Sequence, residues 1–202
     1  MFPPLADADA DGPVAIGADL EPGTLLDAYR RGLFPMPLGD SGTLGWFSPD
    51  PRAILEFENL HISRSLRRAL RRYRHTINQE FAAVIQACGH PRRAHGWIDP
   101  AMLDAYTRLH EMGWAESIEI WDDEELTGGL YGVRIGRFFA GESMFHVGRD
   151  ASKVALVRMV EYLGGEGLTF MDVQWQTPHL ASLGVTEIPR SDYLQRLAAL
   201  TG

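Results

Sequence analysis

Hydrophobic positions in the first 58 residues come in short groups separated by turn-forming residues. Residues 24–31 can form a short helix that Gly32 ends, and the density of proline and glycine over residues 32–51 indicates loops. Residues 53–57 are a candidate strand. The pattern predicts a small N-terminal α/β domain over residues 1–58.

Apolar residues then recur at helical spacing. Three predicted helices each begin with a residue that can cap an N-terminus, namely Ser63, Asn78 and Asp99. In the first helix the apolar positions fall at i, i+4 and i+7, namely Leu66, Leu70 and Tyr73. The second helix runs to Cys88, and Gly113 closes the third.

Alternating apolar and polar residues from position 116 onward predict strands. Three follow one another over residues 116–121, 126–135 and 138–144, and the last two are joined by a candidate hairpin turn. A helix over residues 152–163 and an apolar strand over residues 168–173 complete the order. These elements predict an α+β fold with a mixed, mostly antiparallel sheet and helices in a second domain, residues 59–202. Their order resembles that of the acyltransferases that use acetyl-coenzyme A, a similarity of fold pattern alone.

Composition indicates a folded protein, with 45% hydrophobic and 23% charged residues. The N-terminus lacks the basic and apolar regions of a secretion signal, and no apolar run approaches the roughly 18 residues of a membrane helix. Cys88 is the only cysteine, and the seven histidines show no metal-ligand spacing. We expect a cytoplasmic protein with no cofactor and no metal ion.

Charge is distributed unevenly along the chain. The formal net charge is −8, which by itself argues against a nucleic-acid partner. Residues 61–75, however, contain no acidic residue and six arginines, namely Arg64, Arg67, Arg68, Arg71, Arg72 and Arg74. A charge run is usually a solvated face, but here no acidic neighbour offsets the repulsion, so we expect this helix to bind phosphates.

Several unusual strings occur in a characteristic order. They are GADL (17–20), AYRRGLFP (28–35), WFSPDPRAIL (46–55), HISRSLRR (61–68), AYTRLHEMG (105–113), GGLYGV (128–133), GESMF (141–145), ASK (151–153) and EIPRSDYL (187–194). Together they make the chain resemble the leucyl/phenylalanyl-tRNA–protein transferases over nearly its whole length. The resemblance implies a GNAT-like C-terminal domain after the small N-terminal one.

The resemblance also implies an activity. Leu or Phe, with Met as a further candidate, would pass from aminoacyl-tRNA to the N-terminal Arg or Lys of an acceptor protein. The new peptide bond would mark the acceptor for degradation through the N-degron pathway. The enzyme would act as a monomer, away from membranes.

Asp172 and Gln174 are the candidate catalytic residues. They lie two apart on a predicted strand, so their side chains should share one face. A carboxylate that accepts a hydrogen bond from the Gln174 amide would make the amide oxygen a better acceptor for the proton of the attacking amine. By pattern alone a buried structural Asp–Gln pair at the end of a strand is the favoured alternative. The resemblance favours catalysis.

Substrate-binding positions are implied by the same resemblance. Glu142 would bind an α-amine, although a lone glutamate at a strand end is more often a surface residue. The hydrophobic pocket would be lined by Phe47, Leu130, Phe139, Met144, Leu156, Met159, Leu163 and Met171, which the pattern alone would assign to the core. Methionine suits a pocket that accepts both Leu and Phe, because its side chain repacks easily.

The tRNA is expected to contact two further regions. Trp97 would stack on the terminal adenine, with Trp46 as a weaker candidate, although either could be an ordinary structural tryptophan. The six arginines would contact the tRNA backbone. Thr177 stands where an asparagine is common in the family, which removes one potential hydrogen bond to substrate.

Three other functions compete with this one. An acetyl-coenzyme A N-acetyltransferase would need a glycine-rich pyrophosphate loop, and FHVGRDASK at 145–153 has one glycine. A non-enzymatic RNA-binding module would explain the arginines but not Asp172, Gln174 and Glu142. A sister transferase that adds Leu to acidic N-termini resembles the strings less well.

Overall fold

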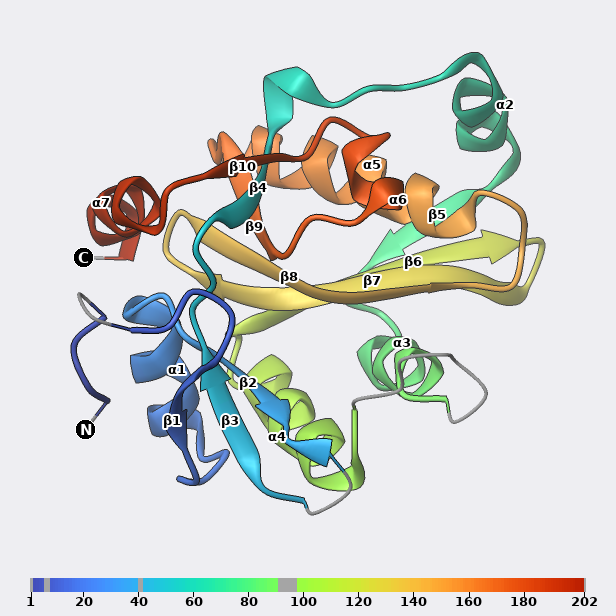
Figure 1. Cartoon of the computed structure of the whole chain (residues 1–202). Helices are drawn as coiled ribbons and strands as arrows, with labels where there is room; N and C mark the ends of the chain where they lie inside the picture. Colours follow the sequence, from blue (N-terminus) through green and yellow to red (C-terminus); the bar gives the residue numbers. More distant parts are fainter. Residues whose placement is uncertain (1, 6–7, 40–41, 91–97, 202) are drawn as a thin grey trace.

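The computed structural model describes residues 2–5, 8–39, 42–90 and 98–201. Two sheets organise the chain (Figure 1). The small sheet has the order β1-β3-β2 and the large one the order β10-β4-β9-β8-β7-β6-β5. The strands of the small sheet are β1 (Pro13–Ile16), β2 (Phe34–Pro37) and β3 (Leu44–Phe47). Those of the large sheet are β4 (Arg52–Glu56), β5 (Arg74–Ile77), β6 (Ala115–Asp122), β7 (Glu125–Ile135), β8 (Phe138–His146), β9 (Phe170–Gln174) and β10 (Thr186–Ile188).

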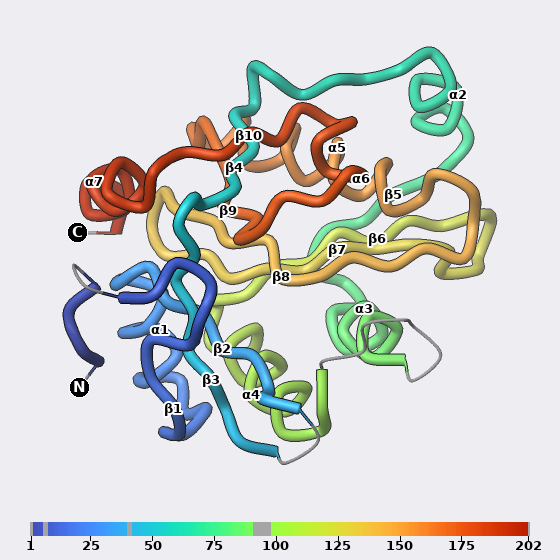
Figure 2. The backbone as a smooth tube through the Cα atoms, in the orientation of Figure 1, coloured from blue at the N-terminus to red at the C-terminus, as the bar shows by residue number. Residues whose placement is uncertain are grey.

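Helices cover both faces of the large sheet. The helix α5 (Ala151–Gly165) packs on β6, β7 and β8 from one side, with α2 (Arg64–Arg72) on top of it. The other side is covered by α3 (Phe81–Cys88) and α4 (Pro100–Glu111) (Figure 2). The remaining helices are α1 (Pro22–Arg30), the 3₁₀ turn η2 (Phe57–Asn59), α6 (Pro178–Ala181) and α7 (Arg190–Thr201). One hydrophobic cluster joins the small sheet to the α3 and α4 side, and a second fills the α5 side.

The predicted fold class is confirmed. The strands β6, β7 and β8 form an antiparallel meander, and Gly136 adopts a positive φ of 59° in the hairpin turn. The crossover through α5 then brings β9 parallel to β8. Asp99 caps α4 by accepting a hydrogen bond from Met102 N–H at 2.8 Å. No helix among the described residues is long and apolar enough to span a membrane.

Two predicted boundaries are corrected. The arginine-rich helix ends at Arg72, and Arg74 begins β5, which pairs with β6 at the sheet edge. Asn78 does not cap α3. It adopts a positive φ of 56°, and its Oδ1 accepts from Ser117 N–H at 2.7 Å instead.

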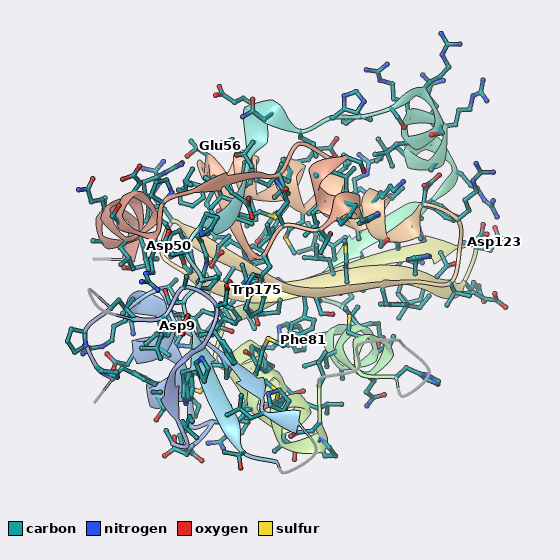
Figure 3. All side chains as sticks on the ribbon, in the orientation of Figure 1. Asp9, Asp50, Glu56, Phe81, Asp123 and Trp175 are labelled. Atoms are coloured by element: carbon teal, nitrogen blue, oxygen red, sulfur yellow. The ribbon has the colours of Figure 1, made fainter. Side chains whose placement is uncertain are left out.

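The strand β4 links the two expected domains. The predicted boundary at residue 58 places it in the N-terminal domain, yet it lies between β9 and β10 in the large sheet. The division into two domains stays a prediction. Trp175, labelled in Figure 3, lies where the two sheets meet, with its ring 4.9 Å from that of Phe34 and 5.9 Å from that of Phe47.

Candidate functional site

A pocket opens where the parallel strands β8 and β9 separate. Among the described residues their ladder pairing is limited to Ala140 with Asp172. Beyond that pair lies a pocket of about 100 Å³, which we call the Glu142 pocket. It is lined by Leu130, Gly141, Glu142, Ser143, Met144, Leu156, Met171, Val173, Gln174 and Leu180. Parallel strands that part in this way leave a site between them without disturbing the rest of the sheet.

Four of the eight predicted pocket residues line this pocket, namely Leu130, Met144, Leu156 and Met171. Three others, Phe139, Met159 and Leu163, are fully buried in the hydrophobic cluster on the α5 side. Phe47 packs against Trp175 in the other cluster. Sequence cannot separate pocket residues from core residues here, because both sets are apolar and come from the same elements, β7, β8, β9 and α5.

Glu142 enters the pocket through a β-bulge. Tyr131 pairs with Ser143, but Gly132 pairs with Gly141, so Glu142 is one extra residue in β8. The backbones of β7 and β8 approach each other closely at this bulge. The position on β7 must therefore be glycine, because a Cβ on Gly132 would lie 2.2 Å from the Ala140 carbonyl oxygen.

Two tyrosines anchor the Glu142 carboxyl. Tyr106 donates to Glu142 Oε2 at 3.3 Å, and the Tyr106 and Tyr29 hydroxyls lie 2.6 Å apart. The other oxygen, Oε1, is buried and has no hydrogen-bond partner among the described residues. Burial raises the pKa of Glu142 to about 8, against the lowering effect of the two hydroxyls. The group therefore titrates close to physiological pH.

Asp172 lies outside the pocket lining and is fully buried. Its Oδ1 accepts from Arg52 Nε at 2.8 Å and from the backbone N–H of Gln174 at 3.0 Å. Its Oδ2 accepts from Arg52 Nη2 at 2.6 Å and from the Tyr193 hydroxyl at 2.9 Å. A carboxylate offers about four lone-pair positions, so this one has no capacity left.

The expected contact between the Asp172 carboxylate and the Gln174 side chain is wrong. The Gln174 Nε2 is buried without a hydrogen-bond partner in the described chain. The side chains of Asp172 and Gln174 do not share one face of β9, because Gln174 has a φ of +61° and ends the strand in a turn. Gln174 consequently lines the pocket with Met171 and Val173, whereas Asp172 contacts Arg52 and Tyr193.

Trp46 does not take the stacking position expected of it. Trp46 is fully buried, and its indole N–H donates to the Gly17 carbonyl at 2.7 Å, so it cannot stack on a base in this arrangement. Trp97 lies outside the described residues, and its stacking role stays a prediction. Thr177 caps α6, since its Oγ1 accepts from Leu180 N–H at 3.2 Å.

The arginines of α2 form an exposed basic face. Arg64, Arg67, Arg68 and Arg71 are exposed and form no ion pair within the described part of the chain. The expectation that the run has no acidic partner is wrong for Arg72, which pairs with Asp122 at the end of β6. Arg74 lies in β5, with its guanidinium carbon 5.1 Å from the centroid of the Trp121 ring.

A second hollow, which we call the basic pocket, lies between α2 and the start of α5. Its volume is about 250 Å³. It is lined by Ser65, Arg68, Ala69, Arg72, Tyr73, Arg149 and Asp150. Arg72 pairs with Asp122 and Arg149 with Asp150, so Arg68 is the arginine of this lining that has no ion pair within the described chain and can meet a phosphate group.

Sequence reasoning did not find Arg52, Tyr193, Tyr29 and Tyr106. Each lies within a string quoted above, but no local pattern marks it as part of a site. A fully buried arginine is detectable only when its carboxylate partner is known, and Asp172 is 120 residues away in the sequence.

Comparisons with family models and with related sequences match one family over most of the chain. The family model described as leucyl/phenylalanyl-tRNA protein transferase matches residues 54–198, and the model of that family's N-terminal domain matches residues 18–50. A leucyl/phenylalanyl-tRNA–protein transferase from Anaeromyxobacter dehalogenans is 48% identical, over 98% of this chain and 86% of that protein. One from Aromatoleum aromaticum is 50% identical, over 99% of this chain and 86% of that protein.

Solved structures are more distant. A GCN5-related N-acetyltransferase from Kribbella flavida matches 82% of this chain and 60% of its own, with 10% identity and a TM-score of 0.46. The family models together match most of the chain, and the two relatives are each at least 48% identical over nearly its full length. The chain therefore belongs to the leucyl/phenylalanyl-tRNA–protein transferase family of enzymes.

Proposed function

We propose that this chain moves Leu or Phe, with Met as a further donor, from aminoacyl-tRNA to the N-terminal Arg or Lys of an acceptor protein. The acceptor α-amine attacks the ester carbonyl carbon, a C–N bond forms, and the C–O bond to the tRNA breaks. The amine loses a proton and the ribose oxygen gains one. The product carries an N-degron, and the enzyme acts as a cytoplasmic monomer.

The Glu142 pocket is the observation that carries this proposal. Four apolar side chains, from Leu130, Met144, Leu156 and Met171, offer a site for an uncharged amino-acid side chain. Two residues of the same lining each hold one polar atom without a partner among the described residues: Glu142 Oε1 and Gln174 Nε2. Buried polar atoms are normally paired, so these two are available to substrate.

The polar atoms match the chemistry of an aminoacyl ester. Glu142 binds the α-amine of the substrate through Oε1. Gln174 presents its amide to the reacting centre, where the unpartnered Nε2 can donate to the substrate and the carbonyl oxygen accepts a hydrogen bond from the attacking amine. Free α-amines have a pKa of about 7.7–8.0, so a neutral fraction exists at physiological pH.

The basic face of α2 binds the tRNA backbone. Arg64, Arg67 and Arg71 are free to contact phosphates, and the basic pocket offers Arg68. Such contacts position the tRNA without reading its sequence. α2 lies on the α5 side of the large sheet, and α5 supplies Leu156 to the Glu142 pocket (Figure 1).

The test is transfer of labelled phenylalanine from Phe-tRNA to a peptide that begins with Arg. The variant Gln174→Ala should lower the transfer rate by about 100-fold or more, which is typical for a group that assists proton transfer. Glu142→Ala should also lower the transfer rate, because the substrate α-amine loses the carboxyl that binds it. Tyr162→Phe, which alters a hydroxyl outside the pocket lining, is the matched control and should retain activity. Acetyl-coenzyme A should not serve as donor.

Other outcomes select other functions. Transfer only to peptides with acidic N-termini would point to the sister transferase. Acetylation of the peptide would point to an N-acetyltransferase. Binding of tRNA with no transfer to any peptide would leave an RNA-binding module.

A further inference from the structure

Gln174 sits at the centre of a strained turn. The N–H of Trp175 donates to the carbonyl of Val173 at 2.8 Å, which closes a three-residue γ-turn around Gln174. Its φ of +61° is the unfavourable sign for such a turn, which is rare and strained in proteins. A residue other than glycine keeps such a positive φ only when the surrounding structure imposes it.

Asp172 supplies the contact that imposes the turn. Its Oδ1 accepts the backbone N–H of Gln174 at 3.0 Å, an i to i+2 bond from a side chain to the backbone. The remaining acceptor positions of the carboxylate are taken by Arg52 and Tyr193. The carboxylate is thus fixed in both position and orientation.

Arg52 is itself held on every side. Its guanidinium carbon lies 4.8 Å from the ring centroid of Phe34 and 4.5 Å from that of Tyr193. Its Nη1 donates to the Gly32 carbonyl at 3.1 Å. Arg52 is the first residue of β4 and Tyr193 belongs to α7, so distant parts of the chain converge on one carboxylate.

We propose that Arg52 and Tyr193 are positioning residues that act through Asp172 to hold Gln174 in the γ-turn, which carries its side chain into the Glu142 pocket. Asp172 is then an anchor for the backbone of Gln174 and exchanges no proton with its side chain. The consequence for catalysis rests on the proposed function, whereas the consequence for the turn does not.

Kinetics of the full-length protein test the catalytic consequence. Tyr193→Phe removes one donor and should lower kcat for Phe transfer about 10-fold, with KM for Phe-tRNA within about twofold of wild type, because the pocket walls are untouched. Arg52→Lys keeps the charge but loses the bidentate geometry and should lower kcat further. Arg196→Lys, which breaks a bidentate pair with Glu56, is the matched control and should stay within about twofold. An unchanged kcat in Tyr193→Phe would overturn the proposal.

Hydrogen exchange tests the turn without reference to activity. Peptides that cover residues 170–176, followed by mass spectrometry, report the Gln174 amide. Its exchange should speed up by about 10-fold in Tyr193→Phe and stay unchanged in Arg196→Lys. Unchanged exchange in Tyr193→Phe would refute the positioning role, even if the wild-type protein proved to transfer nothing. If Arg52→Lys does not fold, Tyr193→Phe alone decides both measurements.

Discussion

Glu142 owes its place in the pocket to a single extra residue in β8. The bulge opposite Gly132 turns this side chain away from the regular alternation and toward the unpaired part of β8 and β9. The family resemblance singled out Glu142, but its tyrosine partners come from α1 and α4 and were not predictable. The raised pKa of Glu142 is a product of this tertiary burial.

The variant Glu142→Gln should reveal that pKa as a change in stability with pH. A carboxyl whose pKa rises from 4.5 in the unfolded chain to about 8 in the folded protein binds more protons when folded. Its ionisation destabilises the fold progressively between these two values. The stability of Glu142→Gln relative to wild type should therefore increase from pH 4.5 to pH 8, by roughly 1–3 kcal/mol, less than full burial would give because the residue is only partly buried.

Urea unfolding at several pH values measures this difference. Glu125→Gln, at an exposed position on β7, is the control and should show no comparable trend. A constant difference between Glu142→Gln and wild type across the range would show that Glu142 titrates normally.

At the scale of one element, the helix α2 shows which features the spacing of apolar residues predicts and which it does not. Its cap and its apolar stripe were predicted correctly: Ser63 Oγ accepts from Leu66 N–H at 3.2 Å, and Leu66 is buried. The end of α2 was predicted wrongly, because Arg74 pairs with Trp121 of β6 and the chain forms the strand β5 there. Edge pairing of this kind depends on a partner 47 residues away, which no local pattern records.

Single replacements on α2 should weaken tRNA binding and its dependence on salt together. Arg64→Ala, Arg67→Ala and Arg71→Ala should each reduce the slope of log affinity against log salt by about 0.7–0.9 if the residue contacts one phosphate. Filter binding of Phe-tRNA over a range of salt concentrations measures the slope. Arg31→Ala removes an arginine paired with Asp27 on α1 and should leave the slope unaltered.

A slope that is the same in wild type and in all three α2 variants would mean that this face is only solvated. The tRNA would then have to bind elsewhere, and the basic pocket with Arg68 would be the next surface to test.

At the scale of the whole molecule, two buried arginines connect segments that are far apart in sequence. Arg52 joins β4 to Asp172, Tyr193 and the Gly32 carbonyl. Arg190, at the start of α7, donates to the carbonyl oxygens of Ala8 at 2.8 Å, Asp9 at 3.2 Å and Ser48 at 2.6 Å. Asp9 and Asp50, which accepts from the Arg190 N–H, are labelled beside this junction in Figure 3.

Arg190→Ala should destabilise the protein by roughly 2–4 kcal/mol, because three carbonyl oxygens lose a charged donor at once. Urea unfolding should show a lower midpoint with an unchanged m-value. Arg108→Ala removes an exposed ion pair with Glu21 and should change the midpoint far less. Equal losses in the two variants would contradict the linking role of Arg190.

The sequence by itself determined the fold class, most of the helices, the central meander and the family, and it singled out Glu142 and Gln174, which line the pocket. These follow from local periodicity, from caps and turns such as Asp99 and Gly136, and from strings that are rare in combination. Tertiary structure decided which apolar residues line the pocket rather than the core. It also decided that Asp172 binds Arg52 and Tyr193 instead of the Gln174 side chain. The reason is that the bulge in β8, the positive φ of Gln174 and the ion pair between Arg52 and Asp172 break or extend beyond the local periodicity that sequence patterns record.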